Sequence, residues 1–263
     1  MSGFSADWLA LREPADTRAR DVSLTTQLAR LAGHRVPARF VDLACGTGAN
    51  LRYLAPRVEG EQHWLLVDSD ASLLAKVGSV PGCRIETRQL DLVSDLHAVD
   101  FAPDVIVTAS ALLDLVSEGW LAELVERCRA HRCAALFALS YDGRIAFTPT
   151  DTDDAWIRDL VNRHQLTDKG FGPALGPDAW RRACELFRDA GYDVHTAQSD
   201  WDLLPTERLL QQLLLEGWAS AAMDLAPGES DRCRSWLARR LGHVTNETSR
   251  ITVGHEDVLA RPR

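Results

Sequence analysis

The hydrophobic pattern of the first 140 residues alternates between two periodicities. Short apolar runs, which are typical of buried strands, are separated by segments whose apolar residues recur at helical spacing. The predicted strands cover 38–43, 63–68, 84–89, 104–109 and 134–140, and the helices between them cover 48–56, 71–77 and 117–130. Strands that alternate with helices in this way favour βαβ units, so the pattern predicts an α/β fold with a parallel sheet.

Helical spacing also dominates both flanks of this core. Residues 4–33 predict one or two helices that end at Gly33. The later pattern predicts a short helix near 154–164, a helix capped by Asp178 that ends at Ala190, a strand near 192–199, helices at 206–225 and 230–242, and a last strand at 250–259. The paired late helices are interpreted as a lid over the substrate side.

The segment 142–177 interrupts this rhythm. It contains an acidic cluster and then a run, 169–177, whose glycines and prolines exclude regular structure. Because the large aromatic Phe171 lies in this run, we interpret it as a shaped functional loop. Several tryptophans outside the first half of the sheet are expected to form the lid core or to line an apolar pocket: Trp120, Trp156, Trp180, Trp201, Trp218 and Trp236.

The first predicted strand ends in a turn of small residues. Its sequence, Asp42-Leu-Ala-Cys-Gly-Thr-Gly48, leads directly into a helical pattern, and Asp68 ends the next strand. Glycines let backbone N–H groups approach a ligand closely, and an acid at the end of the second strand suits the two hydroxyls of a ribose. A dinucleotide fingerprint requires a third glycine, but Leu51 stands at that position. The pattern therefore indicates a nucleoside site that does not favour a pyrophosphate.

These residues resemble the class I S-adenosylmethionine-dependent methyltransferases. The sequence V-D-L-A-C-G-T-G at 41–48 is similar to their first motif, Asp68 to their second and Asp91 to their third, and the resemblance covers about 36–140. It implies a Rossmann-like sheet of seven mostly parallel strands with helices on both faces and helical lid insertions. It also implies S-adenosylmethionine as the cofactor and S-adenosylhomocysteine as the product.

The resemblance assigns roles to residues around the turn. Asp42 would hold the cofactor amino group, Asp68 the ribose and Asp91 the adenine amine beside Leu92, while Thr47 and Asn50 would either contact the ligand or cap the following helix. Arg20, from the N-terminal segment, would pair with the cofactor carboxylate. The full set of expected cofactor residues is Arg20, Asp42, Ala44, Cys45, Gly46, Thr47, Gly48, Asn50, Asp68, Ser69, Asp91, Leu92 and Ser110.

The acceptor side carries fewer signals. Asp114 follows the fourth strand, where the family presents groups that flank the transferred methyl, and it would act as a base, orient the acceptor or cap a helix. Tyr141 follows the fifth strand and would contact the acceptor or simply pack. The D/N-P-P-Y/F pattern of enzymes that methylate nucleobase amines is missing, which argues against a base amine. His164 is most simply a structural or surface residue.

Composition and charge narrow the partners and the cellular compartment expected for the protein. The 263 residues carry a net charge of −9, which disfavours a nucleic-acid partner. No apolar run is long enough to cross a bilayer, and the first residues do not resemble a signal peptide, so a cytoplasmic protein is expected. Six scattered cysteines suggest reduced thiols, and no spacing suggests a metal site. The chain is expected to be a monomer or a homodimer.

The sequence therefore predicts an enzyme that methylates an O, N or C atom of a small molecule. The alternatives are an RNA or protein methyltransferase, a non-catalytic cofactor-binding subunit and a nicotinamide oxidoreductase, the last disfavoured by the missing glycine. The expected organisation is an N-terminal helical segment (1–35), a cofactor-binding core (36–141), a substrate-side insertion (142–177), a core helix and strand (178–204), a helical lid (205–248) and a final strand (249–263).

Overall fold

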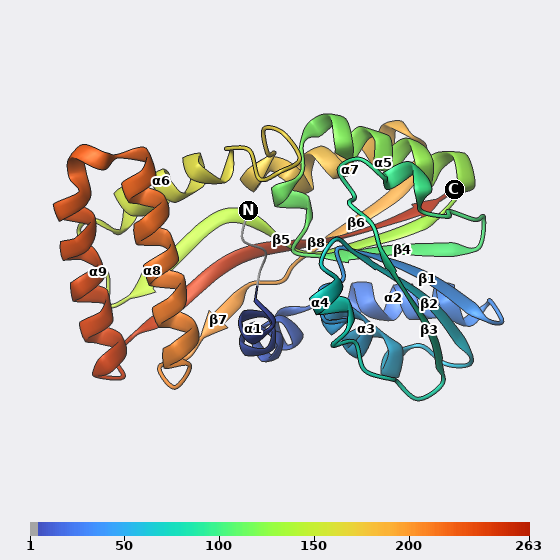
Figure 1. Cartoon of the computed structure of the whole chain (residues 1–263), viewed down its shortest axis with the longest axis horizontal. Helices are drawn as coiled ribbons and strands as arrows, with labels where there is room; N and C mark the ends of the chain where they lie inside the picture. Colours follow the sequence, from blue (N-terminus) through green and yellow to red (C-terminus); the bar gives the residue numbers. More distant parts are fainter. Residues whose placement is uncertain (1–4) are drawn as a thin grey trace.

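A mixed sheet forms the centre of the molecule in the computed structural model, which describes residues 5–263 (Figure 1). Its strand order is β3-β2-β1-β4-β5-β8-β6, with β7 also paired to β8. The pairs among β1 to β5 are parallel, whereas β8 runs antiparallel to β5, β6 and β7. The strands are β1 (Ala38–Leu43), β2 (Gln62–Asp68), β3 (Cys83–Gln89), β4 (Val105–Ser110), β5 (Ala134–Thr148), β6 (Tyr192–Gln198), β7 (Trp201–Leu203) and β8 (Arg250–Pro262).

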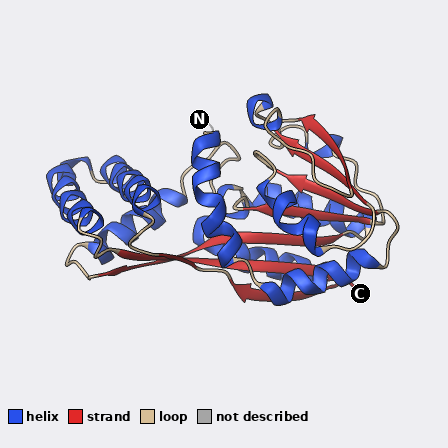
Figure 2. Ribbon diagram, turned by 90° about the horizontal axis from the view of Figure 1, so that it is seen from below, coloured by secondary structure: helices blue, strands red, loops and turns tan. Residues whose placement is uncertain are grey.

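Helices cover both faces of the sheet and one of its ends (Figures 1 and 2). They are α1 (Ala6–Ala19), α2 (Val22–Gly33), α3 (Ala49–Leu54), α4 (Ala71–Leu74), α5 (Glu118–His131), α6 (Asp154–Gln165), α7 (Ala179–Asp189), α8 (Arg208–Leu225) and α9 (Ser230–Thr245). The predicted Rossmann-like α/β fold is thus confirmed, with one short strand, β7, more than the seven expected.

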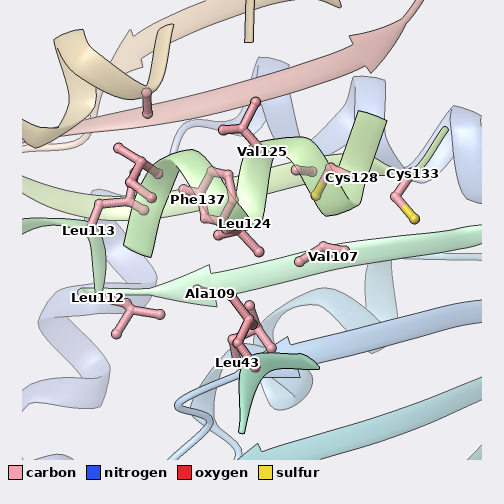
Figure 3. Packing of buried hydrophobic residues seen from close by; sticks show 14 of the residues in the cluster. Leu43, Val107, Ala109, Leu112, Leu113, Leu124, Val125, Cys128, Cys133 and Phe137 are labelled. Carbon is pink, nitrogen blue, oxygen red and sulfur yellow. The ribbon is translucent and has the colours of Figure 1, made fainter. Parts of the chain in front are cut away.

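Side-chain alternation along the strands divides the core into two layers. Leu43, Val107 and Phe137 point to the face covered by α5 and α7, where they meet Leu124 (Figure 3). On the other face Phe40 stacks on the Trp64 ring at 4.1 Å, beneath α2 and α3. Because the strands are buried on both faces, they consist of nearly continuous apolar runs, which explains why the sequence pattern revealed them.

The strands β5 and β8 extend far beyond the rest of the sheet. The prediction that strand five ends near residue 140 was wrong, because the antiparallel pairing with β8 continues to Thr148 opposite Arg250. This ribbon, to which β7 adds a short third strand along β8, carries α6, α8 and α9 at the left of Figure 1, and Figure 2 shows the same strands leaving the core. Its own apolar cluster includes Phe147, whose ring meets the edges of Trp218 and Trp236.

Two further sequence expectations need correction. The helix expected at 71–77 ends at Leu74, because Lys76 and Val77 bond to carbonyls only three residues back and so tighten the last turn. Asp178 does not cap α7 with its side chain; its carboxylate instead accepts a bond from Arg181 at 3.1 Å.

A buried ion pair fixes α9 against α6. Arg240 is 1% exposed, donates to Asp154 and to the carbonyl of Pro149, and lies over the Phe147 ring. Its neighbour Arg239 is 42% exposed and pairs with Asp151 at the surface. Arg240 and Arg239 therefore each pair with an aspartate, but the Arg240 side chain is buried and the Arg239 side chain is exposed.

We predict that Arg240→Met lowers the free energy of unfolding by about 3–5 kcal/mol, because Asp154 is left as a charge without its partner. The control Arg239→Met should cost no more than about 1 kcal/mol, as exposed pairs do. Urea unfolding followed by circular dichroism measures both. Equal losses for the two variants would show that Arg240 is not the anchor of α9.

Candidate functional site

The turn between β1 and α3 lies at the carboxyl edge of the sheet. Ala44, Gly46 and Gly48 all have positive φ, at 51°, 54° and 83°, a conformation that only glycine adopts without strain. This geometry points the N–H of Gly46 at Asp68, whose Oδ2 accepts it at 2.7 Å. The turn and the acid of the second strand therefore form one unit.

Asp68 links this turn to the next strand. Its Oδ1 accepts the N–H of Asp70 at 3.0 Å, and its carbonyl accepts the N–H of Leu90. Asp91 follows immediately and is exposed, with Oδ1 accepting the N–H of Val93 at 3.0 Å in a local turn. Leu92 is buried, and its carbonyl accepts the indole N–H of Trp120. Asp42 lies near the end of β1, Asp68 ends β2, and Asp91 follows β3, so the three acids expected in the cofactor site lie at the same edge of the sheet.

A chain of buried polar groups lies behind the turn. Asp42 is fully buried, and its Oδ1 accepts bonds from Asn50 at 2.6 Å and Thr108 at 2.7 Å. Burial raises the pKa of Asp42 to about 6, against the lowering effect of these bonds and of the Arg20 charge. Its Oδ2 is buried without a partner among the described residues.

Arg20 continues this chain toward the last strand. Its Nη1 donates to Asn50 at 2.9 Å, its Nε lies 3.9 Å from Asp257, and its guanidinium lies 4.5 Å from the centre of the Tyr53 ring. The Nε and Nη2 atoms are buried and make no hydrogen bond within residues 5–263. Arg20 lines a small cavity of about 10 Å³ together with Asn50 and Ser110. A guanidinium with free donors at this cavity fits a carboxylate ligand.

The other predicted turn residues have structural partners. Neither Thr47 nor Asn50 caps α3, because Gly48 occupies the N-cap position and no side chain bonds there. Thr47 Oγ1 instead accepts from Arg52 at 3.3 Å. Burial raises the pKa of the Cys45 thiol well above its usual range, so this thiol stays protonated. Ser69 is exposed, and its carbonyl accepts from Gln89.

The helix α1 covers the turn. Leu9 packs so closely over Gly46 that its Cδ1 would lie 2.9 Å from a Cβ at that position. Glu13 makes two hydrogen bonds of 2.7 Å to Arg52 of α3. Ala15 is the one buried residue of α1, and Trp8, Leu11 and Ala19 pack against the same apolar cluster, so polar contacts and apolar packing together hold this helix in place.

Asp114 lies in a short 3₁₀ helix, Leu113–Leu115, beyond the end of β4. It is 7% exposed, and its Oδ1 has no hydrogen-bond partner in the described part of the chain. Burial raises the pKa of Asp114 to about 6, although the N–H of Tyr141 and the charges of Arg12 and Lys169 lower it. The residue sits within the 3₁₀ turn and caps no α-helix, so the helix-cap interpretation was wrong.

Tyr141 and His255 face each other across β5 and β8, next to Asp114. The Tyr141 hydroxyl donates to Asn162 at 2.6 Å, and its ring centre lies 6.3 Å from that of His255. Burial and the charge of Arg12 lower the pKa of His255 to about 3, so the imidazole is neutral. Its Nδ1 is buried without a partner among residues 5–263. Buried polar atoms without partners are uncommon in proteins and mark this as a candidate acceptor region.

Sequence reasoning missed several of these residues. Glu13, Thr108, His255 and Asp257 were not singled out. One signal was available for the last two, because the charged triplet His255-Glu-Asp257 interrupts an otherwise apolar strand. The sequence did not indicate a role for Thr108, since this residue lies in an apolar run that is typical of any buried strand.

The described residues offer no group of three or more His, Cys, Asp or Glu side chains arranged to hold a metal ion. All six cysteines carry free thiols. Of the helices within residues 5–263, none combines the length and the apolar character needed to cross a membrane.

Comparisons with known proteins agree with this geometry. Residues 40–132 match the sequence model of the family described as Methyltransferase domain. A trans-aconitate 2-methyltransferase from Klebsiella pneumoniae (strain 342) is 27% identical over an alignment 219 positions long, which covers 74% of this chain and 77% of the relative.

Solved structures show the same fold. A cyclopropane-fatty-acyl-phospholipid synthase-like protein from Lactobacillus casei ATCC 334 aligns with a TM-score of 0.52 at 15% identity over 97% of this chain and 94% of its own. The cyclopropane synthase MmaA2 from Mycobacterium tuberculosis aligns with a TM-score of 0.51 at 12% identity, over 98% and 95% of the two chains.

We predict that Asp68→Ala weakens the binding of S-adenosylhomocysteine by roughly tenfold to a hundredfold, because a charge-assisted acceptor for two hydroxyls is lost. Titration calorimetry measures the affinity. The control Asp70→Ala removes a neighbouring acid that caps α4 through Ser72 and should leave the affinity nearly unchanged. An Asp68→Ala protein that is folded and binds normally would contradict the ribose assignment.

Proposed function

We propose that this chain, which is a class I S-adenosylmethionine-dependent methyltransferase, methylates a small-molecule acceptor. The observation that supports a small acceptor is the burial of the acceptor region. Asp114, Tyr141 and His255 are each less than 9% exposed, and Arg12 of α1 lies close enough to shift the pKa values of Asp114 and His255. A folded macromolecule would not reach groups that are enclosed in this way.

The cofactor is S-adenosylmethionine, and S-adenosylhomocysteine is its product. When bound, the cofactor supplies a methyl group on a positively charged sulfur. We assign Asp68 to the ribose hydroxyls and Asp91 to the adenine amine. The Arg20 donors that lack partners suit the carboxylate of the cofactor. The buried carboxylate of Asp42, which accepts a hydrogen bond from Asn50, suits the amino group of the cofactor. Ala44, Gly46 and Gly48 keep the backbone of the turn close to the ligand.

Asp114 is our candidate for the group that accepts a proton from the acceptor or orients it. A carboxylate with a pKa of about 6 is largely ionised at neutral pH and is a stronger base than an exposed aspartate. Its Oδ1 makes no hydrogen bond to the described residues, so it remains available to the acceptor. Tyr141 forms the adjoining wall, because its hydroxyl is committed to Asn162 and only its ring is free to pack against an acceptor.

The curated relative supports the same class of acceptor. Its name makes trans-aconitate, a small carboxylic acid, its substrate. Methyl transfer of this kind depends mainly on alignment and on the exclusion of water, since the donor is already activated. The helices on the β5–β8 ribbon and α1 enclose the region in the way that such exclusion requires.

The alternatives remain testable against this proposal. A non-catalytic subunit would bind the cofactor without turning it over, and an RNA or protein methyltransferase would label a macromolecule. The protein is incubated with methyl-labelled S-adenosylmethionine and a cell extract separated into small-molecule, RNA and protein fractions. Label in the small-molecule fraction supports the proposal. Label confined to RNA or protein, or binding without formation of S-adenosylhomocysteine, would reject it.

We predict that Asp114→Asn lowers turnover by roughly a hundredfold or more, because the amide does not accept a proton. The affinity for S-adenosylhomocysteine should change little. In the unmodified enzyme, activity should fall as the pH drops below about 6, since Asp114 becomes protonated there.

Asp159→Asn, at a carboxylate that is 69% exposed, serves as the control and should keep full turnover and the same pH profile. If Asp114→Asn retains both the rate and the acid limb of the profile, Asp114 is not the proton acceptor.

A further inference from the structure

Lys169 stands apart from the other cations of this chain. It is one of only two lysines among 29 Lys and Arg residues, the other being Lys76. It lies in the loop between α6 and the 3₁₀ helix Gly176–Asp178 and is partly buried. An ammonium has three N–H donors and, unlike a guanidinium, changes its pKa readily when buried.

Two of these donors have partners, and neither partner is a carboxylate. Lys169 Nζ lies 3.0 Å from Thr167 Oγ1 and 3.1 Å from Nδ1 of His164. His164 is oriented in turn by Asp224 of α8, 3.7 Å from its Nε2. Within residues 5–263 no Asp or Glu oxygen comes within 4.0 Å of Nζ, so one N–H donor has no hydrogen-bond partner.

The loop that carries Lys169 is packed against the Asp114 segment. The N–H of Leu175 donates to the carbonyl of Val116 at 2.8 Å, and the Phe171 ring meets the edge of Trp120 at 5.3 Å. Lys169 is close enough to Asp114 that its charge lowers the pKa of that carboxyl. Burial lowers the pKa of Lys169 itself, while Asp114 and Asp224 raise it.

We propose that Lys169, held by Thr167 and by the His164–Asp224 pair, is an anchor for a carboxylate group of the acceptor. The inference rests on the proposed function and names its substrate class as small carboxylic acids. The acceptor lies between Asp114, which faces its reacting atom, and Lys169, which holds its charge. Lys169 is a positioning residue in this arrangement.

A carboxylate fits this position better than a phosphate does. Lys169 offers one N–H without a partner, and the negative charge of Asp114 nearby would repel a dianion more strongly than a monoanion. Arg12, the other cation near Asp114, is already paired with Asp16 at 3.0 Å, and Asp16 also accepts the indole N–H of Trp201. The site therefore favours a ligand with a single negative charge.

The presence of only two lysines permits a direct test. The whole protein, saturated with S-adenosylhomocysteine, is acetylated with sulfosuccinimidyl acetate at several pH values, and the modification of Lys169 and of Lys76 is followed by mass spectrometry. Benzoate and propionate are the carboxylate probes, benzamide is the uncharged counterpart of benzoate, and inorganic phosphate is the competing anion.

We expect Lys169 to be acetylated at lower pH than Lys76, and benzoate or propionate to slow its reaction at least about fivefold. Benzamide and phosphate should have little effect, and the reaction of Lys76 should not change with any probe. Protection by phosphate as strong as that by the carboxylates would overturn the choice of carboxylate. Absence of protection by both carboxylates would overturn the anchor.

Variants provide an independent readout. The affinity of the carboxylate that protects best is measured by calorimetry in the presence of S-adenosylhomocysteine. Lys169→Met should weaken it at least about tenfold, Lys169→Arg should restore part of the loss, and the control Lys76→Met should have no effect. Equal carboxylate affinity in Lys169→Met and Lys76→Met would refute the proposal.

The same experiment separates this inference from the function on which it depends. S-adenosylhomocysteine should bind equally well to all three variants, because none of them touches the cofactor residues. If S-adenosylhomocysteine does not bind the unmodified protein, the proposed function itself fails. If it binds but the carboxylate effects are missing, only the carboxylate anchor fails.

Discussion

The site depends on one buried chain of charged and polar groups that joins Asp257, Arg20, Asn50 and Asp42. It connects β8, the junction between α1 and α2, the start of α3 and β1, and it ends at Thr108 of β4. Charges placed in the interior are tolerated only when partners offset their lost hydration. Each group therefore depends on the next for its hydrogen bonds, and Arg20 lines the cavity beside Asn50 as a member of this chain.

The acceptor region has a different construction. Its walls come from the end of the sheet, from α1 and from helices carried on the β5–β8 ribbon. Asp114 and Tyr141 belong to the first of these, Arg12 to the second, and His164 to the third. The cofactor side is thus built around one chain of buried polar groups, whereas an apolar cluster joins β5 to α1 and to the ribbon helices on the acceptor side.

The strands and helices of the core could be predicted from the sequence because each pattern that indicates them lies within a short segment. Strands buried on both faces appear as apolar runs, and a glycine turn followed by an acid one strand later is visible without knowledge of the fold. What it did not reveal depends on contacts between distant residues. The continuation of β5 to Thr148 requires β8, more than a hundred positions away, and Arg20 acquires its partners from α3 and from the last strand. The exception is Asp178, a common cap residue whose carboxylate accepts a bond from Arg181, three positions further on, instead of capping α7.

The ribbon also contains two irregularities in its pairing, on either side of Tyr141. Such bulges bend and twist a pair of strands, so the curvature of the ribbon is concentrated beside the acceptor region. Gly254 allows this close approach, because a Cβ there would collide with Asp142. The distance between Asp114 on the core and His164 on the ribbon-borne helices is consequently a function of strand curvature. Strand curvature, in addition to side-chain chemistry, then sets the separation of these two walls of the candidate acceptor region.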